Sequence, residues 1–228
     1  MKFRTKIILI VVGLLTIGLV WVEIDLRQFA DGINADPMRR DSLANATFFS
    51  DTSQTKIIAA DNDMTFLVLT KQILTILKSK NYKMLSYFIH PTIGLRFSPY
   101  AHIDTTSDIT FTTNNFLDKT IQQNKFNWGS YDGSGDKILL TIENYFKQFV
   151  YSADFLNADK TSLNKIIGVG NSSNNLETIY KNCNFTESYF AGFDKKLDGM
   201  DWCCLRLVYK KYNSKNYLIG IVHDQWTI

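Results

Sequence analysis

The sequence predicts an α+β domain in which N-terminal helices pack on a curved, mostly antiparallel sheet, preceded by a transmembrane helix. Three observations carry this prediction. An uncharged apolar run opens the chain, apolar residues recur at three- and four-residue steps over 62–79, and strand-like segments follow one another from residue 184 to the end. Helices first and a meander last are typical of α+β proteins.

The apolar run defines the expected membrane segment, residues 7–24. Three cations, Lys2, Arg4 and Lys6, precede it, and it stays uncharged up to Glu23, about the shortest length that spans a hydrocarbon core. The letters GLVWVE, which end at Glu23, lack the small residues of a signal-peptidase site, so an uncleaved anchor is favoured over secretion after cleavage. The positive-inside bias predicts a cytoplasmic N-terminus and an extracytoplasmic domain.

The rest of the chain divides into a polar linker, 25–61, and one domain, 62–228. The linker has no sustained apolar period and is rich in turn-forming residues. With 228 residues, of which 45% are hydrophobic, the chain has enough apolar material for one core beyond the membrane segment. Its 25 basic and 22 acidic residues give a formal charge of +3, so no nucleic-acid partner is expected.

Apolar periodicity and capping residues predict the helices of the domain. The first helix covers 62–79. Asn81, Thr112 or Thr113, and Thr141 stand where the side-chain oxygen of a cap would accept a backbone N–H. The later helices are expected over 81–90, 114–123, 142–151 and a short segment that reaches Tyr180.

β-branched and aromatic residues between turn signals predict the strands. They are expected at 94–100, 108–111, 128–131, 184–190, 202–212 and 217–227. The letters DGSGD at 132–136 are a strong turn signal, because glycine adopts positive φ without a steric penalty. Asn213 and Ser214 are expected to form the turn of a hairpin between the last two strands.

A set of aromatic and polar residues on these strands could line a ligand-binding cleft. Its members are Arg96, Tyr100, His102, Trp128, Tyr131, Arg206 and Trp226. Ligand sites combine apolar walls with a few convergent polar groups, which this set would provide if the strands bring it together. The alternative is that the aromatic members belong to the core.

Catalytic and metal chemistry have weaker support. His223, Asp224 and Asp201 are the candidates for a hydrolytic site with acid and base groups. The chain has three histidines, none at the spacing of metal ligands, so no metal site is expected. No cofactor is expected either, because the chain has no motif that would bind one.

The three cysteines allow two interpretations. Adjacent Cys203 and Cys204 would point to opposite faces of a strand, and one of them could pair with Cys183 in an oxidising compartment. The other interpretation is that all three are buried free thiols that act as small apolar side chains.

Several segments resemble a family of uncharacterised bacterial extracytoplasmic proteins, often lipoproteins, that end in H-D-x-W-T-I. The segments are IHPTIGLRFSPYAHID, NWGSYDGSGDKILLT, YFKQFVYSADFLNA, AGFDKKLDGMDWCCLRLVY and YLIGIVHDQWTI. The resemblance implies an exported domain and no particular reaction. The chain departs from the lipoprotein pattern because no cysteine precedes Cys183, which leaves the helix as its expected anchor. The order of elements also resembles the NTF2-like or cystatin-like layout, a cone-shaped α+β fold that can hold a pocket.

Together these observations favour a binding protein over an enzyme. The leading hypothesis is a membrane-anchored envelope protein whose non-catalytic domain binds a small ligand or another envelope protein, with residues 7–24 in the membrane. One alternative is a hydrolase with a polar cleft centred on His223 and Asp224. The other alternative is a structural component of an envelope assembly, which would have an exposed apolar patch in place of a concave pocket.

Overall fold

The computed structural model of this 228-residue chain describes residues 52–227. The expected membrane segment, 7–24, and most of the expected linker lie outside the described residues, so both remain predictions. Among the residues that are described, no helix is both long enough and apolar enough to cross a membrane. The described residues belong to one compact unit.

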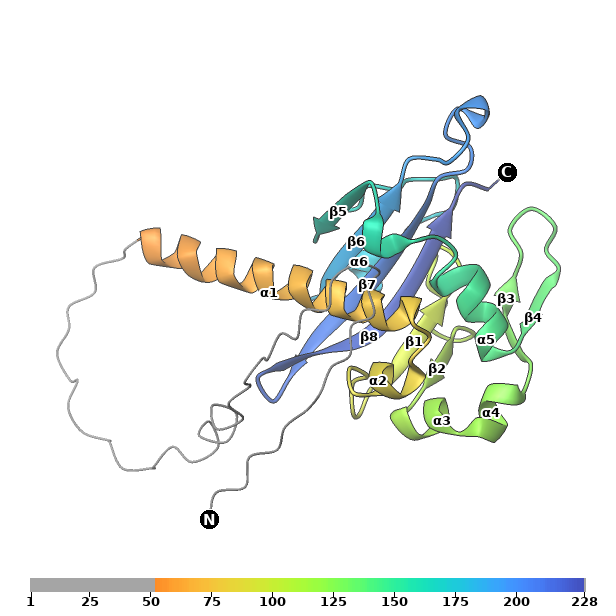
Figure 1. The fold of residues 1–228 in the computed structure, drawn as a ribbon, viewed down its shortest axis with the longest axis horizontal. Helices are drawn as coiled ribbons and strands as arrows, with labels where there is room; N and C mark the ends of the chain where they lie inside the picture. Colours follow the sequence, from red (N-terminus) through yellow and green to blue (C-terminus); the bar gives the residue numbers. More distant parts are fainter. Residues whose placement is uncertain (1–51, 228) are drawn as a thin grey trace, which may run out of the picture. The chain divides into compact units, whose positions relative to one another are not determined.

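A six-stranded sheet forms the centre of this unit, in the order β2-β1-β8-β7-β6-β5 (Figure 1). Its strands are β1 (Leu95–Ser98), β2 (Ile109–Phe111), β5 (Lys160–Leu163), β6 (Asn184–Phe190), β7 (Cys203–Tyr212) and β8 (Lys215–Gln225). Neighbouring strands are antiparallel except β1 and β8, which run parallel with Arg96 opposite Gly220. Two further strands, β3 (Phe126–Ser130) and β4 (Lys137–Leu140), pair as a separate antiparallel hairpin. The predicted α+β class with a mostly antiparallel sheet is confirmed.

The helices begin where the sequence offers capping side chains. They are α1 (Thr52–Lys78), α2 (Tyr82–Ser86), α3 (Thr113–Leu117), α4 (Lys119–Gln123), α5 (Ile142–Tyr145), the π-helix η2 (Phe146–Val150), α6 (Leu176–Ile179) and two short 3₁₀ turns, η3 (Phe155–Asn157) and η4 (Lys195–Leu197). The side chains of Asn81, Thr112 and Thr141 each accept a backbone N–H at the start of α2, α3 and α5. Asp118 caps α4 in the same way, so the helix expected over 114–123 is split in two.

Helix α1 packs across one face of the sheet, where Figure 1 draws it in orange in front of the blue strands. Its buried side chains include Phe66, Ile73 and Leu77, at the spacing that puts them on one side of a helix. The Thr70 hydroxyl lies on the same side and forms hydrogen bonds of 2.7 Å with the hydroxyls of Thr186 and Tyr209. Helix and sheet are therefore joined by apolar packing and by a buried polar contact.

The opposite face of the sheet carries a second, smaller apolar group. Successive residues of β7 alternate between the faces, so Leu207 packs in the larger core and Val208 in the smaller one. Helix α6 supplies Leu176 to the smaller core. The glycine- and asparagine-rich segment before α6, residues 164–175, runs over this face and is called the covering segment below.

The hairpin of β7 and β8 has the expected turn. Asn213 and Ser214 both have positive φ, 45° and 63°, which is the backbone conformation of a type I′ turn. This turn type matches the right-handed twist of the two long strands. The three C-terminal strands and their order are thus confirmed.

Some elements differ from the prediction. Helix α1 begins at Thr52, so the end of the expected linker is helical, and α2 ends at Ser86, well before Pro91. Strands β4 and β5 were not predicted. Among the described strands, β4 pairs only with β3 across the turn at 132–136, and β5 is an edge strand that pairs with β6, so both depend on strand pairing more than on local propensity.

Candidate ligand-binding cleft

A cleft opens at the C-terminal end of β1. It lies between the loop that follows β1, the hairpin of β3 and β4, and one residue of the covering segment, and its volume is about 420 Å³. The lining residues are Pro99, Tyr100, His102, Asp104, Ser107, Asp108, Trp128, Gly129, Ser130, Tyr131, Asp132 and Ser172.

Aromatic rings form the inner wall of the cleft. Trp128 is buried, and its indole N–H donates a hydrogen bond of 2.8 Å to the carbonyl of Leu140. Its ring stacks on that of Tyr145, with centroids 3.8 Å apart. Tyr100 and Tyr131 are half-buried, so part of each ring is open to a ligand.

The loop after β1 is folded around the carboxylate of Asp104. That carboxylate accepts hydrogen bonds from the hydroxyls of Thr106 and Ser107, at 2.6 and 2.7 Å, and from their backbone N–H groups. These bonds lower the pKa of Asp104, the Thr106 hydroxyl having the largest effect. The loop therefore keeps a negative charge at the cleft.

Asp108 is the carboxylate that lies deepest in this loop. Its Oδ2 accepts hydrogen bonds from the Ser98 hydroxyl and from the backbone N–H of Asp104. Burial raises the pKa of Asp108 to about 6, while those two bonds and the charge of Arg96 act in the opposite direction. The negative charge of Asp108 is therefore less well stabilised by its surroundings than the negative charge of Asp104.

Asp132 is the third carboxylate, on the exposed turn that follows β3. Its pKa is lowered by the nearby Thr227 hydroxyl, although that group lies outside hydrogen-bond geometry, and by the hydroxyl of Ser172 and the N–H of Gly133. The Ser172 hydroxyl donates to Oδ2 over 3.1 Å. The backbone N–H of Asp132 in turn donates to the Tyr100 hydroxyl over 3.2 Å. These bonds tie the hairpin to the loop and to the covering segment.

The Tyr145 hydroxyl lies behind this wall without a hydrogen-bond partner among the described residues. The side chain is 1% exposed. Burial raises the pKa of Tyr145 well above its usual value, and the charges of Asp108 and Tyr100 add to the effect. A buried hydroxyl without a partner costs free energy, so this one is an unused polar group beside the cleft.

The covering segment is attached to the loop of β1 by side-chain hydrogen bonds. Asn175 forms two bonds with the backbone of Ile103, donating to its carbonyl over 3.0 Å and accepting from its N–H over 2.8 Å. The Ser173 hydroxyl lies 3.1 Å from Nδ1 of His102. The relative position of two cleft walls is thereby defined.

The structure brings together four of the seven residues that were expected to bind a ligand. Tyr100, His102, Trp128 and Tyr131 all line the cleft. Arg96 lies on β1 but does not line the cleft, and its Nε is 3.4 Å from the hydroxyl of Thr110 on β2. The remaining two, Arg206 and Trp226, do not line the cleft.

Arg206 belongs to a buried ion cluster on the face under the covering segment. Its Nε donates to Glu187 over 2.7 Å, and its Nη1 and Nη2 donate to Asp224 over 3.2 Å. Its Nη2 also donates to the carbonyl of Gly168 over 2.8 Å, and Glu187 accepts the N–H groups of Ile167 and Gly168. The side chains of Arg206 and Glu187 are fully buried. This cluster attaches the covering segment to the sheet and leaves no room for a ligand.

The cluster also depends on a close approach of the backbone at Gly168. A Cβ atom there would lie 2.8 Å from the ring of Trp202, closer than side-chain carbons come in folded proteins. Glycine is therefore needed for the covering segment to reach Arg206.

The three catalytic candidates do not converge. His223 and Asp224 are adjacent on β8 and project to opposite faces, His223 toward Phe149 and Asp224 toward Arg206. Asp201 lies elsewhere, where its Oδ2 accepts the N–H groups of a loop at Phe193 and Asp194. The geometry thus gives no support to a hydrolytic site composed of these residues.

His223 has a structural environment of its own. Its Nδ1 lies 3.1 Å from the Pro99 carbonyl, which can only accept, so Nδ1 carries the proton and Nε2 faces the Ser152 hydroxyl at 3.4 Å. Complete burial is the main reason that its pKa falls to about 4, and the Arg206 charge acts in the same direction. The imidazole is therefore neutral and supports the back of the cleft wall at Pro99.

Neither metal ligands nor a disulfide occur among the described residues. No group of three His, Cys, Asp or Glu side chains in the described part of the chain is arranged to hold a metal ion. Cys183, Cys203 and Cys204 are all free thiols. Cys203 packs in the larger core, whereas Cys204 lies at the opposite face close to Gly168, as expected for adjacent residues of a strand.

Three polar residues of the cleft, Asp104, Asp108 and Ser172, were not among the predicted site residues. Asp104 and Asp108 flank Thr-Thr-Ser, a composition typical of any turn, and Ser172 lies in a glycine- and asparagine-rich segment in which no site residue was predicted. Two aspartates at both ends of a Ser/Thr turn, next to a strand with aromatic residues, are the one local signal that could have indicated them.

Comparisons with protein-family models, with curated proteins and with solved structures found no match to this chain.

Proposed function

We propose that this chain is a membrane-anchored envelope protein whose extracytoplasmic α+β domain binds a small ligand in the cleft after β1, without catalysis. The observation that carries the proposal is the convergence of Tyr100, His102, Trp128 and Tyr131 on one cavity of about 420 Å³. Small-molecule sites have volumes of roughly 300–1,000 Å³ and combine aromatic walls with a few polar groups.

A ligand screen on the full-length chain tests the binding function. Thermal denaturation is followed in the presence of a library of small polar and aromatic compounds, and binding raises the midpoint because a ligand stabilises the folded state. Tyr131→Ala should abolish the shift by removing part of the aromatic wall. Tyr87→Ala, at an exposed tyrosine outside the cleft, should retain it. Loss of the shift in both variants, or in neither, would contradict a site in this cleft.

The same experiment decides whether the site is catalytic. Asp108 and Asp132 have pKa values shifted in opposite directions, an arrangement that general acid–base catalysis can use. Each compound that binds is therefore incubated with the protein and examined by mass spectrometry. Unchanged compound supports a binding protein, and product formation that Asp108→Asn prevents would replace that conclusion with a hydrolytic one.

The proposed membrane location rests on the apolar run at 7–24 and the three cations before it. The resemblance of several segments to extracytoplasmic proteins also supports a domain outside the cytoplasm. In a bacterial host, full-length chain should resist carbonate extraction, and protease added to spheroplasts should digest the domain. Leu14→Arg with Leu15→Arg should make the chain extractable, while Leu43→Arg with Ala44→Arg should not. The mass of the purified chain reports whether the segment is cleaved.

We also propose that the finer fold assignment is the NTF2-like or cystatin-like layout. Its support is one long helix packed across a mostly antiparallel sheet that ends in a long hairpin. An experimental structure whose helix and sheet superpose on neither layout would contradict it. The binding proposal does not depend on this assignment, because the cleft lies at the end of β1 and not between α1 and the sheet.

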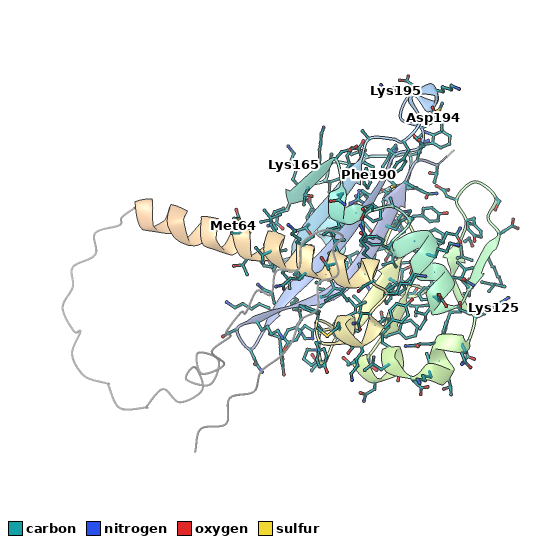
Figure 2. The ribbon with its side chains drawn as sticks, in the orientation of Figure 1. Met64, Lys125, Lys165, Phe190, Asp194 and Lys195 are labelled. Carbon is teal, nitrogen blue, oxygen red and sulfur yellow. The ribbon has the colours of Figure 1, made fainter. Side chains whose placement is uncertain are left out.

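A structural role in an envelope assembly is the second candidate, and one observation favours it. The loop between β6 and β7 exposes three apolar side chains, Phe193, Leu197 and Met200, with Phe193 60% exposed. Figure 2 shows Asp194 and Lys195 on this loop, which projects beyond the ends of the two strands. Clustered exposed apolar side chains are a common feature of contact surfaces.

Sedimentation of the full-length chain in detergent tests this second candidate. An assembly component should form species larger than the monomer, and Phe193→Ser with Met200→Ser should convert them to monomer. Val169→Ser is the control, since Val169 is 78% exposed and lies outside the loop. Monomeric wild-type chain would argue against self-assembly through this loop.

A further inference from the structure

The cleft has an excess of negative charge. Asp104, Asp108 and Asp132 line it, and none of the lining residues among those the structure describes is lysine or arginine. The guanidinium of Arg96 acts on Asp108 electrostatically but does not line the cleft, and its Nε faces Thr110. These carboxylates would repel a phosphate or carboxylate ligand and attract a cation.

The hydrogen bonds of Asp108 leave one oxygen available. The Ser98 hydroxyl and the N–H of Asp104 both donate to Oδ2, and no hydrogen bond from a described residue reaches Oδ1. Burial raises the pKa of Asp108 to about 6, so at neutral pH the carboxylate is ionised at a free-energy cost. A positively charged donor at Oδ1 would remove much of that cost, and a neutral ligand would remove less.

The hydroxyl of Tyr145, whose ring stacks on the cleft residue Trp128, also lacks a partner among the described residues. It is buried, has no hydrogen-bond partner in the described part of the chain, and lies within electrostatic range of Asp108 and Tyr100. Buried hydroxyls in folded proteins nearly always have a partner. Tyr145 does not itself line the cleft, so a water molecule between a ligand and this hydroxyl would be that partner.

The aromatic wall suits an organic cation better than a metal ion. Tyr100, Trp128 and Tyr131 line the same cleft as the carboxylates, and the faces of aromatic rings attract ammonium groups. The acidic residues of the cleft, in contrast, are not arranged as a metal site among the described residues. Divalent cations need several oxygen ligands at once, which an aromatic wall does not supply.

We therefore propose that the cleft binds an organic cation, with its ammonium group at Oδ1 of Asp108 and its carbon skeleton against Tyr100 and Tyr131. This inference rests on the proposed binding function of the same cleft and adds the chemical class of its ligand. The aromatic rings contribute contact area, and the carboxylates select positive charge.

Three probes of similar size test the charge preference on the full-length chain by isothermal titration calorimetry. Benzylammonium, benzyl alcohol and benzoate share a ring and differ in the charge of one substituent. Benzylammonium should bind at least 10-fold more tightly than benzyl alcohol, and benzoate should show no binding, as the carboxylates attract one charge and repel the other. Equal affinities for the three probes, or tighter binding of benzoate, would overturn the inference.

Two variants locate the effect at one carboxylate. Asp108→Asn retains an oxygen that can accept the two internal hydrogen bonds, and it should weaken benzylammonium binding about 10-fold or more. Asp118→Asn, at an exposed aspartate that caps α4 outside the cleft, should leave the affinity unchanged. Equal affinities of wild type and Asp108→Asn would also overturn the inference.

The outcomes separate this inference from the proposed function. If the neutral or anionic probe binds in a manner that Tyr131→Ala abolishes, the cleft is a binding site and only the cation preference is wrong. If none of the three probes binds, the cation preference is wrong for ligands of this size. The library screen with Tyr131→Ala and Tyr87→Ala then decides the binding function by itself.

Discussion

Two groups of carboxylates in this domain have opposite surroundings. Glu187 and Asp224 lie under the covering segment, where Arg206 and backbone N–H groups bond them. The carboxylates of the cleft have serine and threonine hydroxyls and backbone N–H groups as partners, and no lining cation. The first group is complete without a ligand, whereas the second retains an uncompensated charge.

The comparison shows why a shifted pKa alone does not locate a site. Burial raises the pKa of Asp224 to about 6 and that of Asp108 to about 6. The Arg206 guanidinium lowers the pKa of Asp224 against the effect of burial, and this ion pair makes Asp224 part of a closed structural cluster. Asp108 has an oxygen that receives no bond from the described residues and a neighbouring hydroxyl without a partner. The two carboxylates therefore differ in one oxygen, because Oδ1 of Asp224 accepts the N–H of Gln225 and Oδ1 of Asp108 has no partner among the described residues.

The largest expected effect is on the closed cluster. Arg206→Met keeps the approximate volume but leaves Glu187, Asp224 and the Gly168 carbonyl without their cationic donor. Removing one partner of a buried ion cluster costs about 3–5 kcal/mol, so denaturant unfolding should show a loss of this size or an unfolded chain. Lys210→Met, on the exposed part of the same strand, should change stability by less than about 0.5 kcal/mol. A loss below about 1 kcal/mol for Arg206→Met would mean that the cluster is not structural.

A smaller effect of opposite sign is expected for Asp108 in the cleft, where the substitution should raise the free energy of unfolding. The pKa of Asp108 is raised in the folded state, so the folded protein binds more protons than the unfolded chain between about pH 4 and 6, and stability falls as pH rises through that range. Asp108→Asn removes this fall. The variant should exceed wild type by an amount on the order of 1 kcal/mol at pH 8, after allowance for partial exposure, and by nothing at pH 3.5.

Urea unfolding at the two pH values measures this difference. Because the wild type and the variant share every other titrating group, their difference isolates Asp108, and the similar contribution of Asp224 cancels. If Asp108→Asn is less stable than wild type at both pH values, Asp108 has a structural role like that of Asp224, and the contrast between the two regions fails.

The smallest expected effect compares two buried tyrosines. The Tyr209 hydroxyl is hydrogen-bonded to Thr70 at 2.7 Å, whereas the Tyr145 hydroxyl has no partner among the described residues. Tyr209→Phe should therefore cost about 1 kcal/mol of unfolding free energy, and Tyr145→Phe should cost nothing or stabilise slightly. Equal losses in thermal unfolding would show that the Tyr145 hydroxyl does have a partner in the free protein, which would weaken the case for a missing ligand group.

Local signals predicted much of the fold. The periodicity after residue 62 and the caps Asn81, Thr112 and Thr141 indicated real helix starts or helical faces, and Asn213 with Ser214 marked the hairpin turn. These features depend on residues close in sequence, so one sequence is sufficient to find them. The membrane segment at 7–24 lies outside the described residues and stays a prediction.

Long-range pairing could not be predicted in the same way. Nothing local indicates that β1 would run parallel to β8, the pairing that puts Pro99 against His223 and sets the position of the cleft. Arg206 was grouped with the ligand-binding residues because it is a cation on a strand. Only the register between β6 and β7 reveals that Glu187 lies opposite it. Residue types indicated which groups could act, and strand pairing decided where they meet.

The attachment of the covering segment has a consequence for the order of folding. Its anchors are Glu187, Arg206 and Ile103, which belong to β6, β7 and the loop after β1. Since these anchors exist only after distant strands have paired, the segment can dock only late, as contacts of high sequence separation generally form slowly. Amide protons in 164–175 should then exchange with solvent by local opening, faster than those of β7. The covering segment would then complete the cleft in a late step of folding. Its residue Ser172 would be the first part of the cleft wall to separate from the rest of the domain on local opening.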